Sequence, residues 1–201
     1  MATPENASQG PENQLRFQPL TPGNWPAFER LFGERGACAN CWCMYYRLPR
    51  KEFEAGKSGH GNKEAMRALV AAGRPAGILA FQGNQAIAWC AFAPRKDFVR
   101  LANSRIHKPI DELPVWSIPC LFVDKRFRRR GLAVQLLRGV IQYAAEHGID
   151  TLEAYPVIPS GDGLPDAFAW MGPYASFEKA GFIVVDSTSK NRPMVRYRMK
   201  K

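Results

Sequence analysis

Apolar residues follow two spacings along this chain, one typical of strands and the other of helices. Seven runs are β-branched and aromatic or alternate like strands: 15–20, 76–81, 85–93, 115–123, 149–157, 182–186 and 194–199. Four segments carry apolar residues at helical spacing: 25–32, 62–72, 132–144 and 174–180. Strands and helices in this order predict an α/β protein.

The sequence predicts one domain with a short tail. Residues 1–14 contain Pro, Asn, Gln, Glu and Gly with almost no apolar side chains, and we expect them to be disordered. The remaining residues, 15–201, can form one hydrophobic core, because 46% of the 201 residues are hydrophobic. We find no internal repeat.

A strongly basic turn joins the strand at 115–123 to the helix that begins at 132. Pro119 lies inside the strand and predicts a bulge there. The first N–H groups of the helix have no partner within it, and Gly131 would let an anion approach them closely. Together with Arg128, Arg129 and Arg130, this turn is typical of a phosphate site.

Two motifs carry a resemblance to a known family. The pattern Arg128-x-x-Gly131-x-Ala133, between a strand and a helix, resembles the acetyl-CoA pyrophosphate signature of the GNAT acyltransferase superfamily. The segment Phe177–Phe182 resembles that superfamily's late helix-to-strand signature, in which an aromatic residue stands four positions before a glycine. Three further segments resemble an uncharacterised bacterial GNAT subfamily that has a Cys-Trp-Cys segment: 36–47, 115–118 and 153–156.

The resemblance covers the chain from about Leu15 to the C-terminus and implies both a fold and an activity. The implied fold is α/β (α+β), a single GNAT-like domain whose mixed central sheet of about six to seven strands is flanked by about four helices. The implied activity is transfer of the acetyl group of acetyl-CoA to a primary amine, by direct attack of the amine on the thioester. The acceptor would be a small molecule or a protein amine.

The same resemblance implies where acetyl-CoA binds. The strand backbone would pair with the pantetheine arm, and the turn would hold the pyrophosphate. The residues implied are Leu121, Phe122, Val123, Arg128, Arg129, Arg130, Gly131, Leu132 and Ala133.

The acid and the base of this superfamily are not at their usual positions. Phe177 stands where many relatives have the tyrosine that protonates the leaving thiolate, and Tyr174, three residues earlier on the same helix, is our candidate acid. The alternative for Tyr174 is a core or surface aromatic without a chemical role. Ser117 stands where relatives have a carboxylate or histidine, and Glu153 on the following strand is our candidate base, directly or through water. The alternatives are a salt-bridged strand glutamate at Glu153 and an amine that loses its proton to water.

Aromatic residues in the cysteine-rich segment are candidates for the acceptor side. The early helices of GNAT proteins usually line the substrate site, so Trp42, Tyr45 and Tyr46 would pack on an apolar or cationic acceptor. A purely structural aromatic cluster is the alternative.

The five cysteines indicate free thiols and no metal. An odd number, with three crowded at 38–43, is unlike the disulfide framework of a secreted protein and fits a reducing cytoplasm. Cys38, Cys41 and Cys43 lack the second Cys/His pair of a structural zinc site. We expect Cys120, on an apolar strand, to be a packing residue.

The formal net charge of +10 favours polyanionic partners such as coenzyme A. Two alternatives stay open: a GNAT-like protein that binds acyl-CoA without catalysis, and a basic nucleic-acid-binding module, which is disfavoured because no recognition motif is present. No run approaches the ~20 apolar residues of a membrane span and no secretory signal is evident, so we expect a soluble cytoplasmic protein without membrane partners. A homodimer is left open.

Overall fold

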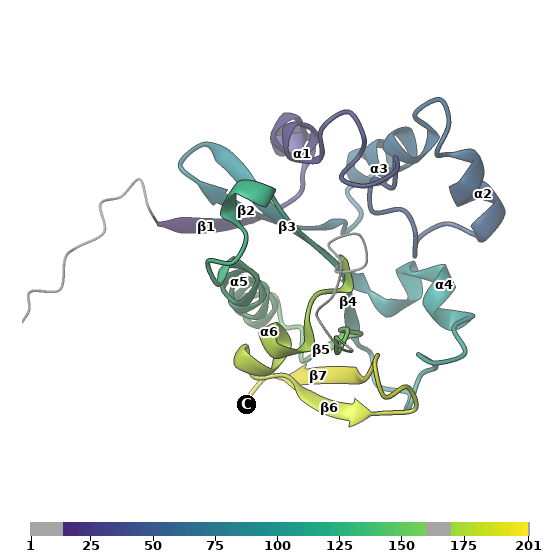
Figure 1. Ribbon diagram of the computed structural model, residues 1–201, viewed down its shortest axis with the longest axis vertical. Helices are drawn as coiled ribbons and strands as arrows, with labels where there is room; N and C mark the ends of the chain where they lie inside the picture. Colours follow the sequence, from purple (N-terminus) through teal and green to yellow (C-terminus); the bar gives the residue numbers. More distant parts are fainter. Residues whose placement is uncertain (1–13, 160–169, 201) are drawn as a thin grey trace, which may run out of the picture.

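A seven-stranded sheet forms the centre of the molecule (Figure 1). The computed structural model describes residues 14–159 and 170–200. The strands are β1 (Leu15–Pro19), β2 (Gly77–Gln82), β3 (Gln85–Pro94), β4 (Trp116–Val123), β5 (Thr151–Ala154), β6 (Ile183–Asp186) and β7 (Met194–Arg198), and their order is β1-β2-β3-β4-β5-β7-β6. Among these seven strands of the described residues, β4 and β5 are the only neighbours that pair in parallel, and the other neighbours are antiparallel. The predicted mixed sheet is therefore confirmed.

Six α-helices within the described residues cover the sheet. They are α1 (Trp25–Phe32), α2 (Arg50–Ala55), α3 (Gly61–Ala71), α4 (Val99–Ala102), α5 (Leu132–Glu146) and α6 (Tyr174–Lys179). Four of them confirm predicted helices. The other two, α2 and α4, are too short to show a helical repeat: α2 buries only Phe53 and α4 only Leu101. The predicted tail, 1–14, lies outside the described residues apart from Gln14.

Two cores form on opposite faces of the sheet. The α5 face buries Leu136, Leu137 and Val140 of that helix against the strands, and the opposite face packs against α1 and α3. Side chains of a strand alternate between the faces, so Leu121 of β4 belongs to the first core and Phe122 to the second. The strand β4 is therefore a wall shared by both cores.

The strands β4 and β5 separate halfway along β4. Their pairing ends at Ile118 opposite Ala154, although β4 continues to Val123. On its other side, β4 carries one extra residue between Ser117 and Cys120, so the bulge predicted from Pro119 is confirmed. Beyond this point, the backbone edge of β4 that faced β5 has no strand partner among the described residues.

Helix α5 lies close to β1 because it has a glycine at the contact. A Cβ added to Gly139 would lie 2.3 Å from the Phe17 ring. We expect Gly139→Ala to lower the free energy of unfolding by about 1–3 kcal/mol through overpacking, although alanine favours helix by about 1 kcal/mol. Urea denaturation measures this.

The control is the same substitution in a Phe17→Ala background, where the ring no longer obstructs the new methyl group. There Gly139→Ala should be neutral or stabilising. Stabilisation in both backgrounds would contradict a tight contact between α5 and β1.

Candidate functional site

The turn before α5 holds the helix N-terminus open. Asp124 accepts a hydrogen bond from the Arg126 backbone N–H at 2.9 Å, and Arg128 Nε donates to the Val123 carbonyl at 3.0 Å. Arg129 and Gly131 have φ values of +61° and +73°, so both residues of this tight turn have left-handed backbone conformations. The first N–H that bonds within the helix is that of Val134, and the earlier N–H groups therefore face outward.

A groove of about 540 Å³ runs from this turn along the unpaired edge of β4 to α6. Eight of the nine residues predicted to bind acetyl-CoA line it: Leu121, Phe122, Val123, Arg128, Arg129, Gly131, Leu132 and Ala133. The ninth, Arg130, is not among the lining residues; its guanidinium lies 6.0 Å from the centre of the Phe127 ring. The turn therefore brings the predicted residues to one site, except for Arg130.

Segments far away in sequence complete the groove. The turn itself adds Phe127, and the distant segments contribute Ala37, Cys38, Trp170, Gly172, Pro173 and Ser176. Sequence reasoning did not assign these residues, because nothing local to them indicates that they fold against β4. Only the predicted position of the α6 start, next to Gly172 and Pro173, would have suggested some of them.

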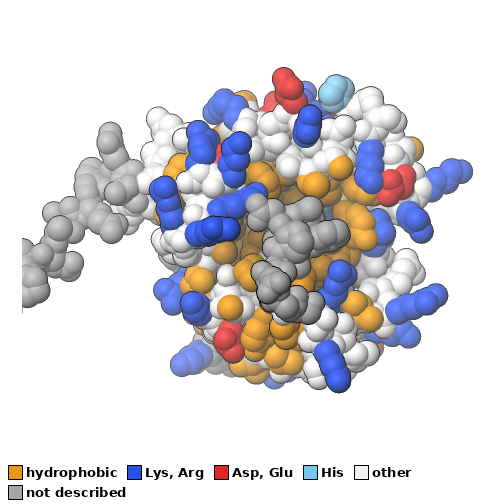
Figure 2. Space-filling view, in the orientation of Figure 1, with side chains coloured by type: hydrophobic (Ala, Val, Ile, Leu, Met, Phe, Trp, Pro, Cys, Tyr) orange, Lys and Arg blue, Asp and Glu red, His pale blue; other side chains and the backbone are white. Residues whose placement is uncertain are grey.

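Positive charge surrounds the turn. Arg126 forms an ion pair with Asp124 at 2.6 Å, which holds the pKa of that carboxyl below its usual range. The neighbouring side chains of Lys125, Arg128 and Arg129 add further positive charge. On the face shown in Figure 2, Lys and Arg side chains lie around the hydrophobic side chains that are visible there. An anionic ligand is therefore attracted to this end of the groove.

A smaller cavity of about 230 Å³ lies on the α1 side of β4, and we call it the aromatic pocket. Its rings come from Phe32, Tyr45, Tyr46, Phe53, Phe122 and Trp170. It shares Ala37, Cys38, Leu121, Phe122 and Trp170 with the groove. The two cavities therefore adjoin along the middle of β4.

Two of the three predicted acceptor residues line the aromatic pocket, namely Tyr45 and Tyr46. The third, Trp42, is only 2% exposed and stacks on Phe32 in the core, with ring centres 5.6 Å apart. Trp42 therefore does not line the pocket: residues 42 and 43 both have positive φ, and the indole packs onto Gly36. An acceptor-side role for Trp42 stays a prediction.

All five cysteines are free thiols. The sulfurs of Cys43 and Cys120 are hydrogen-bonded at 3.3 Å, and Trp89 Nε1 donates to Cys43 Sγ at 3.0 Å. The hydrogen bond with Cys43, followed by burial, raises the pKa of Cys120, whereas the hydrogen bonds lower that of Cys43. A raised pKa fits a packing role for Cys120. In residues 14–159 and 170–200, no three His, Cys, Asp or Glu side chains are arranged to hold a metal ion.

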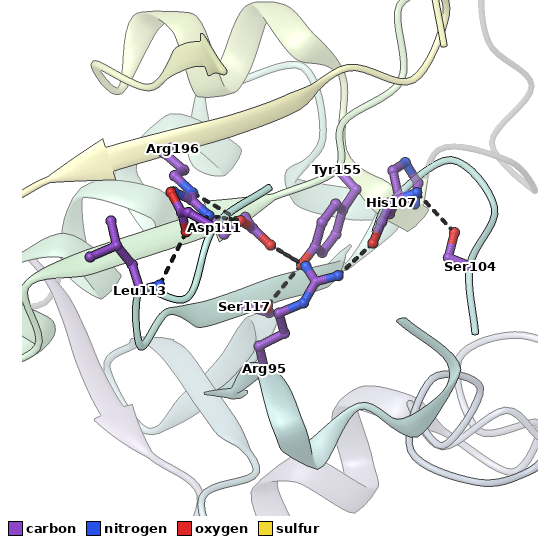
Figure 3. A network of polar contacts seen from close by, with 9 residues as sticks. Arg95, Ser104, His107, Asp111, Leu113, Ser117, Tyr155 and Arg196 are labelled. Atoms are coloured by element: carbon purple, nitrogen blue, oxygen red, sulfur yellow. Dashed lines mark hydrogen bonds and ion pairs between the residues drawn. The ribbon is translucent and has the colours of Figure 1, made fainter. Parts of the chain in front are cut away.

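Glu153 is fully buried and contacts Arg95, Tyr155 and Arg196, three residues of the polar network that Figure 3 labels. Its Oε1 pairs with Arg95 and accepts a hydrogen bond from the Tyr155 hydroxyl at 2.6 Å; its Oε2 accepts one from Arg196 Nε at 2.9 Å. The Tyr155 hydroxyl also lies 2.9 Å from Ser117 Oγ. Glu153 is thus the salt-bridged strand glutamate of our alternative, and it lines neither the groove nor the aromatic pocket.

The network extends to the loop before β4. Arg196 forms an ion pair with Asp111 at 2.5 Å, and this pairing lowers the pKa of Asp111. Arg95 donates to the carbonyl of His107 in the same loop. Ser117 and Glu153 are opposite each other one pair before the strands separate. The network therefore connects β4, β5, β7 and this loop beside the point at which β4 and β5 separate.

Tyr174 begins α6 next to the groove but is not one of its lining residues. Its side chain hydrogen-bonds Glu178, and burial, followed by this glutamate, raises the pKa of the phenol. Ser176 lines the groove instead, and Phe177 is fully buried. A catalytic role for Tyr174 stays a prediction.

Comparison with known proteins identifies the family. The model of the acetyltransferase (GNAT) family matches residues 42–161. The chain belongs to this family. No curated protein matches this GNAT chain. None of its helices within the described residues is long and apolar enough to cross a membrane.

Solved structures share the GNAT fold at low sequence identity. PaiA N-acetyltransferase from Thermoplasma acidophilum, crystallised with coenzyme A, is 12% identical with a TM-score of 0.52; 92% of this chain and 99% of that chain are covered. A GNAT-family acetyltransferase from Streptococcus agalactiae is 13% identical with a TM-score of 0.56, covering 93% and 96%. Arabidopsis thaliana NAA60, crystallised with acetyl-CoA, is 14% identical with a TM-score of 0.50, covering 92% and 100%.

The buried network predicts a large effect of neutralising Glu153. We expect Glu153→Gln to lower the free energy of unfolding by about 3 kcal/mol, because Arg95 and Arg196 lose their shared buried counter-charge. Chemical denaturation measures this. The matched control, Glu112→Gln on the exposed surface, should stay within about 0.5 kcal/mol of wild type. Equal stabilities of the two variants would show that the network contributes little.

Proposed function

We propose that this GNAT protein is an acetyl-CoA-dependent N-acetyltransferase that acetylates a primary amine of a small molecule or a protein. The observation that carries the proposal is the groove, which joins the unpaired edge of β4 to an open helix N-terminus. Coenzyme A and acetyl-CoA in the crystal structures of the Thermoplasma and Arabidopsis proteins support the same donor.

The groove offers each part of acetyl-CoA a suitable partner. The pyrophosphate would accept hydrogen bonds from the outward-facing N–H groups of Leu132 and Ala133, with Arg128 and Arg129 beside it. A Cβ added to Gly131 would meet nothing within 4 Å, so the space at the turn is open. The amide groups of the pantetheine arm would pair with the free edge of β4 near Leu121 and Val123.

The reaction is a direct displacement at the thioester carbonyl. The amine lone pair forms the new C–N bond, the C–S bond breaks, and the sulfur leaves as the thiolate of coenzyme A. Holding both reactants along β4 supplies the proximity that such a reaction needs. The protein must also provide for one proton lost by nitrogen and one gained by sulfur.

For the proton that nitrogen loses, the two acceptors left open by the sequence stay open: Glu153 and water. Because both oxygens of Glu153 are held by arginines, the geometry favours water as the direct acceptor, with Glu153 reached only through Tyr155 and Ser117. For the sulfur, the proposed acid is Tyr174, which lies at the start of α6 beside the groove. It would need to turn away from Glu178 to reach the thiolate.

Donor binding can be tested with two adjacent arginines. Arg129 lines the groove whereas Arg130 does not, and both are exposed. Wild type should gain about 2.7 kcal/mol of stability at acetyl-CoA concentrations of 100 times Kd, measured as a thermal shift. We expect Arg129→Ala to weaken binding about tenfold, the loss of one charge-assisted hydrogen bond.

Arg130→Ala is the matched control, with the same loss of charge. It should change Kd by no more than about threefold, through the electrostatic potential of the whole protein. Absence of any thermal shift at millimolar acetyl-CoA would reject the proposed function. Binding without turnover on any amine would instead indicate an inactive acyl-CoA-binding protein.

The proposed acid is tested by Tyr174→Phe, with Ser176→Ala for comparison. Loss of general acid catalysis should reduce kcat about 100-fold while the Kd of acetyl-CoA stays unchanged. Ser176→Ala should retain wild-type kcat, because its hydroxyl is assigned no proton transfer. The opposite pattern would move the role to Ser176, and wild-type kcat in both variants would assign protonation of the thiolate to solvent.

A further inference from the structure

The aromatic pocket has rigid walls. The Tyr45 ring lies edge-on to Trp170 and Phe53, with ring centres 5.2 Å and 5.4 Å apart, and edge-on to Tyr46 at 5.0 Å. Arg100 stacks on Tyr45 with its guanidinium carbon 3.8 Å from the ring centre. Rings fixed in this way offer apolar surface to a ligand at little cost in side-chain entropy.

The described wall of the pocket holds little charge. Its only charged residues are Glu54 and Lys57, which pair with each other at 2.8 Å and have half-exposed side chains. No further carboxylate among these lining residues is available for a second ammonium group. The stacked Arg100 and the net charge of +10 add repulsion. An acceptor with several positive charges therefore fits poorly, because burying an unpaired charge is costly.

The size of the pocket limits the apolar body that it can hold. An apolar cavity of about 150 Å³ is large enough for benzene. At about 230 Å³, the aromatic pocket has room for one ring and a short arm. The arm would lead toward the groove, because the two cavities share residues on both sides of their junction, including Cys38, Phe122 and Trp170.

An apolar pocket also helps to prepare the nucleophile. Removal from water disfavours the charged form of an amine and lowers its pKa, so the bound acceptor would lose its proton more readily. The proton would go to water at the open end, and the neutral nitrogen would keep its lone pair for attack. This chemistry requires no carboxylate in the pocket.

We infer that the acceptor is a primary monoamine that carries one aromatic ring on a short arm, with the ring bound against the wall formed by Tyr45, Tyr46, Phe53 and Trp170. This inference rests on the proposed acetyltransferase function. In the reaction, nitrogen attacks the thioester carbonyl, the C–N bond forms as the C–S bond breaks, and the products are the aryl-substituted acetamide and coenzyme A. The proton from nitrogen goes to water, and the thiolate of coenzyme A takes up one proton.

The test compares three amines at equal concentrations with acetyl-CoA, by measuring release of the coenzyme A thiol. The amines are 2-phenylethylamine, ethylamine and spermidine. Burial of the phenyl ring should make kcat/KM for phenylethylamine about 10- to 100-fold higher than for ethylamine. Spermidine, which carries additional charges, should be no better than ethylamine.

Two variants of Tyr45 then test where the phenyl ring of the acceptor binds. Tyr45→Ala should remove most of the preference for phenylethylamine over ethylamine, whereas Tyr45→Phe keeps the ring and should retain it. The Kd of acetyl-CoA, measured by thermal shift, should stay within about threefold in both, because Tyr45 does not line the groove. If Tyr45→Ala does not fold, the comparison of amines with wild type still decides the matter.

The two proposals fail differently. Preference for spermidine, or no turnover of phenylethylamine by a protein that binds acetyl-CoA, would overturn the aromatic acceptor and leave donor binding intact. Failure to bind acetyl-CoA would overturn the acetyltransferase function itself.

Discussion

The separation of β4 from β5 is the constraint on which the rest of the site depends. Parallel pairing stops at Ile118 and Ala154, and the bulge at Pro119 redirects the second half of β4. Backbone groups that would have paired with β5 are left open along one edge. The strand β4 therefore borders both cavities: Cys120 lines the aromatic pocket, Val123 lines the groove, and Leu121 and Phe122 line both.

A buried charge cluster lies just before this opening. Glu153, Arg95 and Arg196 would be costly to bury singly, and each has a partner of opposite charge; the exposed Asp111 is a second partner of Arg196. The cluster includes Arg196 of β7 and the loop before β4, and it reaches β4 through the hydroxyl groups of Tyr155 and Ser117. These contacts stabilise the pairing of β4 with β5 up to its last pair, Ile118 and Ala154, and so fix the position at which the two strands separate.

The two cavities differ in the chemistry of their walls. The groove ends at a helix N-terminus with arginines, which suits a charged donor, whereas the aromatic pocket has rings and thiols. This division favours direct transfer between a donor and an acceptor held side by side. In the reaction that we propose, the amine would be activated without a free carboxylate, since burial itself lowers the amine pKa.

Local sequence determined the elements of the fold and the anion-binding turn. The spacing of apolar residues predicted all seven strands. The resemblance carried by the basic turn implied nine cofactor residues, and all but Arg130 line the groove, because a helix N-terminus and its preceding strand are contiguous in the chain. What Trp42, Glu153 and Trp170 contact was decided only by the tertiary structure. Positive φ at residues 42 and 43 turned Trp42 into the core, and arginines from β7 and from the segment after β3 surrounded Glu153. These contacts join residues distant in the chain, so their partners depend on how the sheet and helices pack rather than on local spacing.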